Sequence, residues 1–379
     1  MATNNNNKAL NVPPLRFPKF TEEWETKPIN DLAVVIGGGT PDTTVKSYWD
    51  GEIQWFTPSE IGKTKYVDLS LRTITEDGLN NSSAKRLPPN TILLSSRATI
   101  GECSLSLREC ATNQGFQSLV SKKCNVDFLY YLIQTKKNDL IRKSCGSTFL
   151  EISANEVRKI QVSIPSDVEQ QKIAGLLSLI DERIATQNKI IERLETLIKG
   201  LRNEIFWKLR KNVGFNAMIG DVLDYEQPQS YIVEDTEYID KGTPVLTANK
   251  AFILGYTSET EGIYDKGDCI IFDDFTLDSK YVDFPFKVKS SAIKILTAEN
   301  KELLRYTFEF LKYLDLSTSE HKRHYIAETQ NQEFILPTTQ IVRTIAHTFS
   351  ILSLRMETAI KQRLLFEKQK QYLLRQMFI

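Results

Sequence analysis

The feature that most constrains this chain is an apolar stripe that recurs in alternating steps of four and three residues from Ile173 to Ile205, broken only at Gln187. Heptad spacing places the members of the stripe on one face of an α-helix, and so long a helix needs a partner helix to bury that face. Ser166 and Glu169 have capping-box spacing just before the stripe. The pattern therefore predicts a long spacer helix within residues 161–214.

The C-terminus repeats this helix at an offset of 172 residues. Ile164-Pro165 aligns with Leu336-Pro337, and Ile173-Ala174 aligns with Ile345-Ala346. A second long helix is therefore expected within residues 336–379, as the packing partner of the first. The predicted helix-helix seam consists of Ile173, Leu177, Ile180, Ile184, Ile191, Leu194, Ile198, Leu201, Ile205, Ile345, Phe349, Leu352, Met356, Phe366, Leu373 and Met377.

Short strand-like runs separated by turns precede each helix. At an offset of 177, Ile92-Leu93-Leu94 matches Cys269-Ile270-Ile271, and Gly115-Phe116-Gln117 matches Ala292-Ile293-Lys294. A repeat of this length predicts a duplicated unit, and the mixture of strands and helices predicts the α+β class. The expected order is a disordered tail at 1–14, a globular domain at 15–160, a helix at 161–214, a second globular domain at 215–335 and a helix at 336–379.

The charge distribution limits where nucleic acid could bind. The whole chain has 48 basic and 48 acidic residues, but residues 220–335 contain 22 acidic and only 12 basic ones. An acidic segment disfavours phosphate binding over its whole surface, so a nucleic-acid site there requires a local basic patch. The one dense basic stretch in this segment is Lys280, Lys287, Lys289 and Lys294.

Cysteine usage and hydropathy indicate the compartment. The five cysteines are scattered and form no C-x-x-C pair, which predicts reduced thiols rather than a disulfide framework or a zinc site. No run approaches the roughly 18 apolar residues of a spanning helix, and the Asn-rich start lacks the segments of a signal peptide. We therefore expect a cytoplasmic protein with no membrane partner.

Three motifs that suggest catalysis are each incomplete. Gly62-Lys63-Thr64 resembles the end of a phosphate-binding loop, but position 57 is Thr where that loop needs glycine. The acidic run from Asp273 to Lys280 is more compressed than a nuclease site, and His321 and His324 have no evident third metal ligand. The sequence therefore predicts no catalytic residue, no metal and no cofactor.

Several stretches, in this order, resemble the target-recognition domain of type I restriction-modification specificity subunits. They are Gly37-Gly38-Gly39-Thr40-Pro41, Tyr48 to Ile53, Trp55 to Ile61, Thr112 to Phe116, Gly146-Ser147-Thr148, Ile152-Ser153, Ile164-Pro165, Glu169 to Ala174 and Ile180-Asp181. The second half lacks the Gly-Gly-Thr-Pro and Tyr-Trp stretches, so the resemblance covers about the first 210 residues.

The resemblance implies a non-catalytic DNA-specificity subunit. Two target-recognition domains would each read one half of a bipartite target in duplex DNA, and two antiparallel helices would set the spacing and dock the modification subunits. Two similar lobes on a helix pair also suit half-sites about one turn, roughly 34 Å, apart. The implied partners are double-stranded DNA, two modification (methyltransferase) subunits and, through the complex, restriction (endonuclease and translocase) subunits.

Base reading needs donors and acceptors on loops or a helix, with Arg and Lys also contacting phosphates. The candidate DNA-contact residues of the first domain are Thr57, Ser59, Ser96, Arg97, Thr99, Gln114, Gln117, Arg142, Lys143 and Thr148. Those of the second domain are Thr247, Asn249, Lys250, Lys280, Lys287, Lys289, Lys322, Arg323 and His324. The alternative function is a two-lobed protein-protein scaffold that binds other proteins through its acidic surface and has no DNA specificity.

Overall fold

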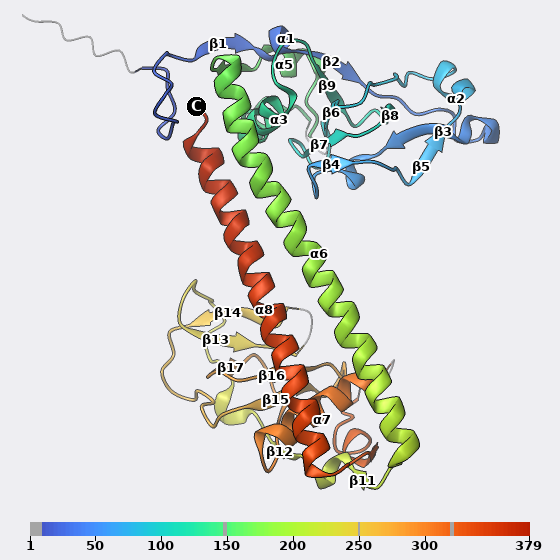
Figure 1. The fold of residues 1–379 in the computed structure, drawn as a ribbon, viewed down its shortest axis with the longest axis vertical. Helices are drawn as coiled ribbons and strands as arrows, with labels where there is room; N and C mark the ends of the chain where they lie inside the picture. The colour runs from blue at the N-terminus through green and yellow to red at the C-terminus, as the bar shows by residue number, and fades with distance from the viewer. Residues whose placement is uncertain (1–9, 147–149, 249–250, 319–321) are drawn as a thin grey trace, which may run out of the picture. The chain divides into compact units, whose positions relative to one another are not determined.

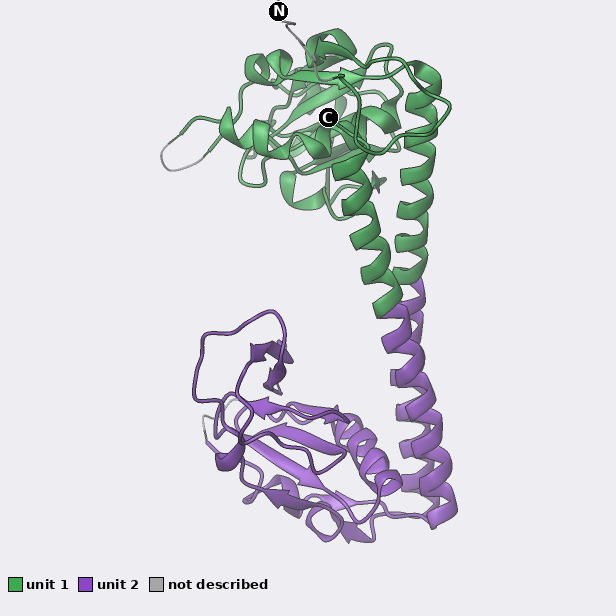
Figure 2. Ribbon diagram, turned by 90° about the vertical axis from the view of Figure 1, so that its left-hand side faces the viewer, with its two compact units in different colours: residues 1–188, 361–379 green, residues 189–360 purple. Residues whose placement is uncertain are grey.

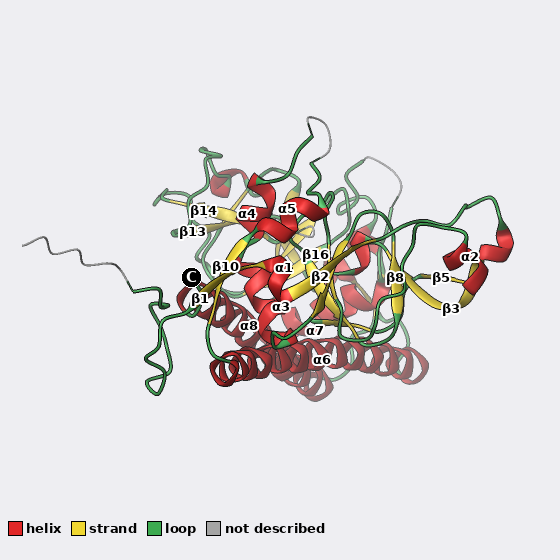
Figure 3. Cartoon of the chain, turned by 90° about the horizontal axis from the view of Figure 1, so that it is seen from above, coloured by secondary structure: helices red, strands yellow, loops and turns green. Residues whose placement is uncertain are grey.

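The computed structural model describes residues 10–146, 150–248, 251–318 and 322–379 and divides the chain into two compact units (Figures 1 and 2). Unit 1 comprises residues 1–188 and 361–379, and unit 2 comprises residues 189–360. Strands and short helices make up the globular part of each unit (Figure 3). The α+β class predicted from the sequence is confirmed.

Two long helices contribute to both units. Helix α6 spans Asp167–Asn212 and helix α8 spans Thr339–Gln376. Helix α6 ends just before Gly214, whose φ of +73° is the left-handed conformation common after helix C-termini. Where the described chain is helical, no segment combines the length and apolar character needed to cross a membrane.

The start of α6 differs from the sequence prediction. The carboxylate of Glu169 was expected to cap the helix, but it accepts two hydrogen bonds from the Arg16 guanidinium, both at 2.7 Å. The Glu169 side chain is almost fully buried. A bidentate partner 153 residues away competes better for a buried carboxylate than a single backbone N–H does.

Unit 1 is built on a five-stranded sheet in the order β2-β9-β6-β7-β4, a three-stranded sheet β5-β3-β8 and the pair β1-β10. Helix α3 packs its run of buried residues from Phe128 to Ile133 into the core. The strands are β1 Glu25–Pro28, β2 Ala33–Gly37, β3 Trp49–Phe56, β4 Tyr66–Val67, β5 Arg72–Ile74, β6 Ile92–Leu94, β7 Cys103–Ser106, β8 Cys110–Thr112, β9 Gln117–Ser121 and β10 Gln161–Ile164. The short helices are α1 Ile29–Leu32, α2 Glu76–Asn80, α3 Val126–Thr135, α4 Lys137–Arg142 and α5 Ala154–Lys159.

Unit 2 has a four-stranded sheet in the order β12-β18-β15-β16, a three-stranded sheet β14-β13-β17 and the pair β11-β19. Helix α7, Lys301–Leu314, buries Tyr306 and Phe310 against this part of the chain. The strands are β11 Ala217–Met218, β12 Asp224–Glu226, β13 Thr243–Leu246, β14 Ile253–Thr257, β15 Cys269–Asp273, β16 Ser279–Val282, β17 Lys287–Val288, β18 Ile293–Thr297 and β19 Glu333–Phe334.

In unit 1 the first part of α6 runs antiparallel to the last part of α8. The Lys370 ammonium of α8 lies 2.7 Å from the Asp181 carboxylate of α6, and the Arg183 guanidinium lies 5.6 Å from the Phe366 ring. The unit 1 core contains the seam residues Ile173, Leu177, Ile180, Leu373 and Met377, with Ile184 and Phe366 partly buried against it.

In unit 2 the last part of α6 packs with the first part of α8. The Arg202 guanidinium of α6 lies 5.8 Å from the Phe349 ring of α8. The unit 2 core contains the seam residues Ile345, Phe349 and Leu352, with Leu194, Ile198, Leu201 and Ile205 partly buried against it. Ile191 and Met356 are also partly buried. In both units the helices are therefore part of the core.

Leu177→Ala tests this role of α6. Leu177 is fully buried, so loss of its methyl groups and the resulting cavity should lower the stability of unit 1 by about 2–5 kcal/mol. Leu179 is 59% exposed on the same helix, and Leu179→Ala should change the stability by less than about 0.5 kcal/mol. Urea unfolding followed by circular dichroism measures both. Equal effects of the two substitutions would contradict the role assigned to the buried face.

Candidate nucleic-acid interface

In unit 1 the loops that follow several strands are tied together by backbone hydrogen bonds. The Ser96 N–H, just after β6, donates to the Gly115 carbonyl at 2.8 Å, and the Ile152 N–H donates to the Ser96 carbonyl at 3.1 Å. The Asn113 N–H donates to the carbonyl of Phe56, the last residue of β3, at 3.1 Å. These bonds bring together what we call the unit 1 loop cluster, residues 38–40, 57–59, 95–99, 113–115 and 150–152.

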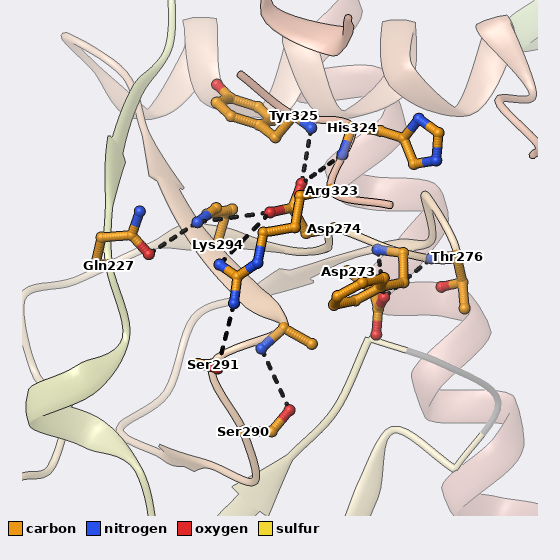
Figure 4. A network of polar contacts seen from close by, with 12 residues as sticks. Gln227, Asp273, Asp274, Thr276, Ser290, Ser291, Lys294, Arg323, His324 and Tyr325 are labelled. Carbon is orange, nitrogen blue, oxygen red and sulfur yellow. Dashed lines mark hydrogen bonds and ion pairs between the residues drawn. The ribbon is translucent and has the colours of Figure 1, made fainter. Parts of the chain in front are cut away.

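Unit 2 contains the same arrangement of backbone bonds. The Asp274 N–H, just after β15, donates to the Ala292 carbonyl at 2.8 Å, and the His324 N–H donates to the Asp274 carbonyl at 3.1 Å. These three residues occupy the roles that Ser96, Gly115 and Ile152 have in unit 1, so we call this three-residue arrangement the shared frame. It supports the unit 2 loop cluster, residues 273–276, 289–292 and 322–325 (Figure 4).

Glycines allow the close approach of chains in the unit 1 loop cluster. A Cβ atom on Gly38 would lie 2.0 Å from the Asn113 carbonyl oxygen, and one on Gly39 would lie 2.2 Å from the Ser83 hydroxyl. Ala98 has a φ of +56°, which is uncommon for a residue with a side chain. The turn after β6 is therefore held in a conformation that its local sequence does not favour.

The predicted contact residues of unit 1 that reach solvent lie on this cluster and on helix α4. Ser59, Thr99 and Gln114 are exposed, and Thr57 and Arg97 are partly exposed. All five have partners within the unit. The Ser59 and Thr57 hydroxyls lie 3.1 Å apart, and the Thr99 hydroxyl donates to the Ser95 hydroxyl at 3.1 Å. Thr57 donates to the Glu60 carboxylate through its hydroxyl at 2.7 Å and its N–H at 2.8 Å. Arg97 pairs with Glu151 at 2.8 Å, and the Gln114 side-chain oxygen accepts a hydrogen bond from the Thr40 hydroxyl at 2.5 Å.

The other predicted contact residues of unit 1 that reach solvent are Arg142 and Lys143, at the end of α4, where Arg142 pairs with Asp139. Thr148 lies outside the described residues.

Two predicted contact residues of unit 1 face inward. Ser96 is fully buried and Gln117 is 9% exposed, so neither side chain is open to a partner in this structure. In the described part of the chain, the Ser96 hydroxyl, the Gln117 side-chain oxygen and the neighbouring Thr112 hydroxyl have no hydrogen-bond partner. Direct contact of Ser96 or Gln117 with DNA would therefore need a movement of the loops above them.

The basic stretch predicted for unit 2 is divided between the surface and the interior. Lys287 is buried, pairs with Glu259 at 2.6 Å and donates to the Glu261 carbonyl at 2.7 Å. Lys294 is also buried, whereas Lys289 is exposed and Lys280 is partly exposed. Two of the four lysines of this stretch, Lys287 and Lys294, are therefore turned inward, so Lys280 and Lys289 are the ones that reach solvent.

The other predicted contact residues of unit 2 are also divided. Lys322 and Arg323 are exposed, and Lys322 pairs with Glu328 at 2.9 Å. His324 is buried with its Nδ1 atom 2.8 Å from Glu328, and Thr247 is buried as well. Hydrogen bonds from Lys322 and then His324 lower the pKa of the Glu328 carboxyl. Asn249 and Lys250 lie outside the described residues.

The sequence prediction named Ser96 and His324 as contact residues but did not identify the shared frame to which they belong. Asp274 was considered only as part of an acidic run, and Lys294 only as part of a basic stretch. The offset of 177 that aligns Gly115 with Ala292 also aligns Gln117 with Lys294, but it aligns Ser96 with Asp273, one residue before Asp274. Within the described ranges, no three His, Cys, Asp or Glu side chains are grouped so that they could hold a metal ion. The exposed side chains of the two clusters are mainly hydroxyls, amides and cations.

Gly38→Ala tests the packing of the unit 1 loop cluster. The new Cβ would lie 2.0 Å from the Asn113 carbonyl and 2.4 Å from the Thr112 carbonyl, so backbone must move. We expect a loss of about 1–3 kcal/mol in stability and faster hydrogen exchange at the Gly39 and Asn113 amides. Gly200→Ala in α6 meets nothing within 4 Å and should be neutral or stabilising by up to about 1 kcal/mol. Unchanged exchange in Gly38→Ala would show that the loops are not tightly held.

Comparison with known proteins finds similar proteins of one kind. Residues 21–196 match the family model of the type I restriction modification DNA specificity domain. The chain is 36% identical over 221 residues to the type I restriction enzyme MjaIX specificity subunit of Methanocaldococcus jannaschii. The aligned region covers 57% of this chain and 51% of that protein. It is 43% identical over 151 residues to the EcoR124I/EcoR124II specificity subunit of Escherichia coli, covering 38% of this chain and 35% of that protein. The chain thus matches about half or less of the length of these curated relatives.

Solved structures agree on the fold of the whole chain. The type I restriction-modification system S subunit from M. genitalium aligns with a TM-score of 0.66 at 16% identity, covering 97% of this chain and 99% of that one. A chain from a study of complex assembly and conformational transition of the type I R-M system aligns with a TM-score of 0.51 at 14% identity, covering 93% and 96%. The fold is therefore similar to that of an S subunit, and residues 21–196 are similar to the type I restriction modification DNA specificity domain.

Proposed function

We propose that this chain is a non-catalytic DNA-specificity subunit of a type I restriction-modification complex. Each unit would read one half of a bipartite target in duplex DNA through its loop cluster. The observation that carries the proposal is the shared frame, because the same backbone bonds support polar and basic loops in both units. A duplicated frame under two different sets of side chains suits a protein that reads two different half-sites.

The exposed side chains of the unit 1 loop cluster suit base edges. Hydroxyls such as those of Ser59 and Thr99 and the amide of Gln114 can donate and accept hydrogen bonds in the major groove. Arg97 can exchange its bond with Glu151 for a guanine or a phosphate, since ion pairs exposed to solvent are weak. In unit 2, Lys289, Lys322 and Arg323 supply the positive charge that phosphate binding needs.

The two long helices also carry surfaces that suit protein partners. Large apolar side chains are exposed along them, which is typical of surfaces that bind other proteins when they are contiguous. These residues are Val168, Leu179, Ile190, Leu197 and Trp207 of α6 and Ile341, Ile351, Leu354, Leu364, Leu365 and Tyr372 of α8. We propose that the helices dock two modification subunits, one for each repeat, and set the spacing between half-sites. Restriction subunits would join through that complex in the cytoplasm, and methyl transfer and cleavage would belong to these partners.

Salt dependence separates this function from the alternative of a protein scaffold. Phosphate contacts release counterions, so the logarithm of the affinity of the assembled complex for duplex DNA should fall with the logarithm of salt concentration, by about 0.9 per contact. The double substitution Arg142→Ala with Lys143→Ala should reduce this slope by up to about 1.8, the value for two phosphate contacts. Lys208→Ala with Lys211→Ala removes the same charge from α6 and is the matched control. A scaffold without DNA specificity would show neither the slope nor the difference.

Exchange of one globular part tests whether each unit reads its own half-site. Replacing residues 215–335 with the corresponding segment of a relative should change one half of the methylated sequence and leave the other half intact. The reciprocal exchange of residues 15–160 is the control and should change the opposite half. Sequencing of methylated sites in cells that carry the whole system measures both. A change in both halves after a single exchange would show that the two units do not read independently.

A further inference from the structure

Unit 2 has a buried pair of opposite charges at the place where unit 1 has neutral side chains. In the shared frame, Asp274 takes the position of Ser96, and Lys294 aligns with Gln117. The Lys294 ammonium lies 3.6 Å from the Asp274 carboxylate, and both residues are 1% exposed (Figure 4). Burial of a carboxylate is costly unless a cation and hydrogen bonds satisfy it.

The Asp274 carboxylate fixes the backbone next to Arg323. One of its oxygens accepts the backbone N–H of His324 at 3.0 Å and that of Tyr325 at 2.7 Å. The Asp274 carbonyl also accepts the His324 N–H at 3.1 Å. Three hydrogen bonds to Asp274 therefore hold His324 and Tyr325, the two residues that directly follow Arg323. They thereby fix the position of the Arg323 backbone.

The Arg323 side chain itself is only loosely held. Its side chain is 48% exposed, and its guanidinium is 4.0 Å from the second Asp274 oxygen and 3.5 Å from the Ser291 hydroxyl, both at the limit of contact. Lys294 is nearer to Asp274 and also donates to the Gln227 side-chain oxygen at 2.8 Å. Within the described part of the chain, Lys294 and Arg323 are the two cations paired with Asp274.

The charges around Asp274 explain why the lysine matters. Burial lowers the pKa of Lys294, and the Asp274 carboxylate opposes that shift. Nearby, Asp273 uses its carboxylate to cap the Phe275 and Thr276 amides, and Glu328 pairs with Lys322 and His324. Without Lys294, the nearest described cation for Asp274 is therefore Arg323.

We propose that Asp274 and Lys294 are positioning residues for Arg323, which binds a DNA phosphate of the second half-site. Asp274 holds the backbone beside Arg323. Lys294 neutralises Asp274, so that the Arg323 guanidinium stays at the surface and available to DNA. This inference rests on the proposed DNA-reading function for its last step, whereas the positioning of Arg323 does not require DNA.

Lys294→Gln tests the positioning without DNA, and it introduces the residue that aligns with Lys294 in unit 1. Arg323 should turn inward to the uncompensated Asp274 carboxylate. Reaction of Arg323 with phenylglyoxal in the full chain, measured by mass spectrometry, should then be several-fold slower. Asp274→Asn with Lys294→Gln keeps an acceptor oxygen for the loop and removes both charges, so Arg323 should react as in the wild type. Lys266→Gln breaks the surface pair with Glu226 and is the matched control for loss of one lysine.

The second measurement uses duplex DNA and the assembled complex. Lys294→Gln and Arg323→Ala should each reduce the salt slope by about 0.9, the value for one phosphate, and combining them should reduce it no further. The neutral pair Asp274→Asn with Lys294→Gln should have the wild-type slope. Asp274→Asn alone keeps an acceptor oxygen and leaves Lys294 to repel Arg323, so it should leave both the reactivity and the slope unchanged. If Lys294→Gln does not fold, Asp274→Ala serves, because it removes the acceptor of the His324 and Tyr325 N–H groups. Hydrogen exchange at these two amides should then be faster, and unchanged exchange would overturn the positioning role of Asp274.

The outcomes distinguish the inference from the function on which it rests. Unchanged Arg323 reactivity in Lys294→Gln, with normal DNA binding, would overturn the positioning role alone. Loss of reactivity or slope in Asp274→Asn, or in the neutral pair, would overturn it as well. Absence of salt-dependent DNA binding by the wild-type complex would overturn the proposed function and the phosphate contact of Arg323, whatever the reagent shows.

Discussion

Burial of one face of α6 and one face of α8 is the constraint on which each unit depends. In unit 1, Leu177 of α6 and Leu373 of α8 belong to the same core as Phe128 of α3. In unit 2, Phe206 of α6 and Phe349 of α8 share a core with residues of α7 and the sheet. Apolar burial is the main favourable term in folding, so neither globular part has a complete core without its helices. The helices are therefore structural members of the units that they also connect.

Buried polar contacts fix how the helices are positioned within this apolar packing. In unit 1 the Tyr131 hydroxyl donates to the Asp181 carboxylate at 2.6 Å, and Lys370 pairs with the same carboxylate. In unit 2 Arg202 of α6 bonds the buried Glu309 of α7 at 2.8 Å. Apolar contacts tolerate sliding, whereas a buried charged hydrogen bond is costly to leave unmade. Such bonds fix the register of the helices against each globular part.

Sequence patterns predicted the helices and the repeat better than they predicted whether a single side chain is buried or exposed. Heptad spacing and the two offsets identified both helices and the repeat, because periodicity is a property of many residues at once. Lys287 and Lys294 were misread as surface residues. Their partners Glu259 and Asp274 come from other loops and strands, and the pairing of buried charges is decided by tertiary contacts. The same holds for Glu169, which binds a distant arginine rather than its own helix.

The shared frame separates what is constant in the two units from what differs. It is made of backbone N–H and carbonyl groups, which every residue except proline provides, so it does not depend on side-chain identity. Ser96 and Asp274 make the same two backbone bonds although one is neutral and the other charged. A loop supported in this way can change its exposed residues without losing its position. The change from a neutral to a charged interior is itself compatible with the frame, provided that a buried acid such as Asp274 gains a cation such as Lys294 at the aligned position.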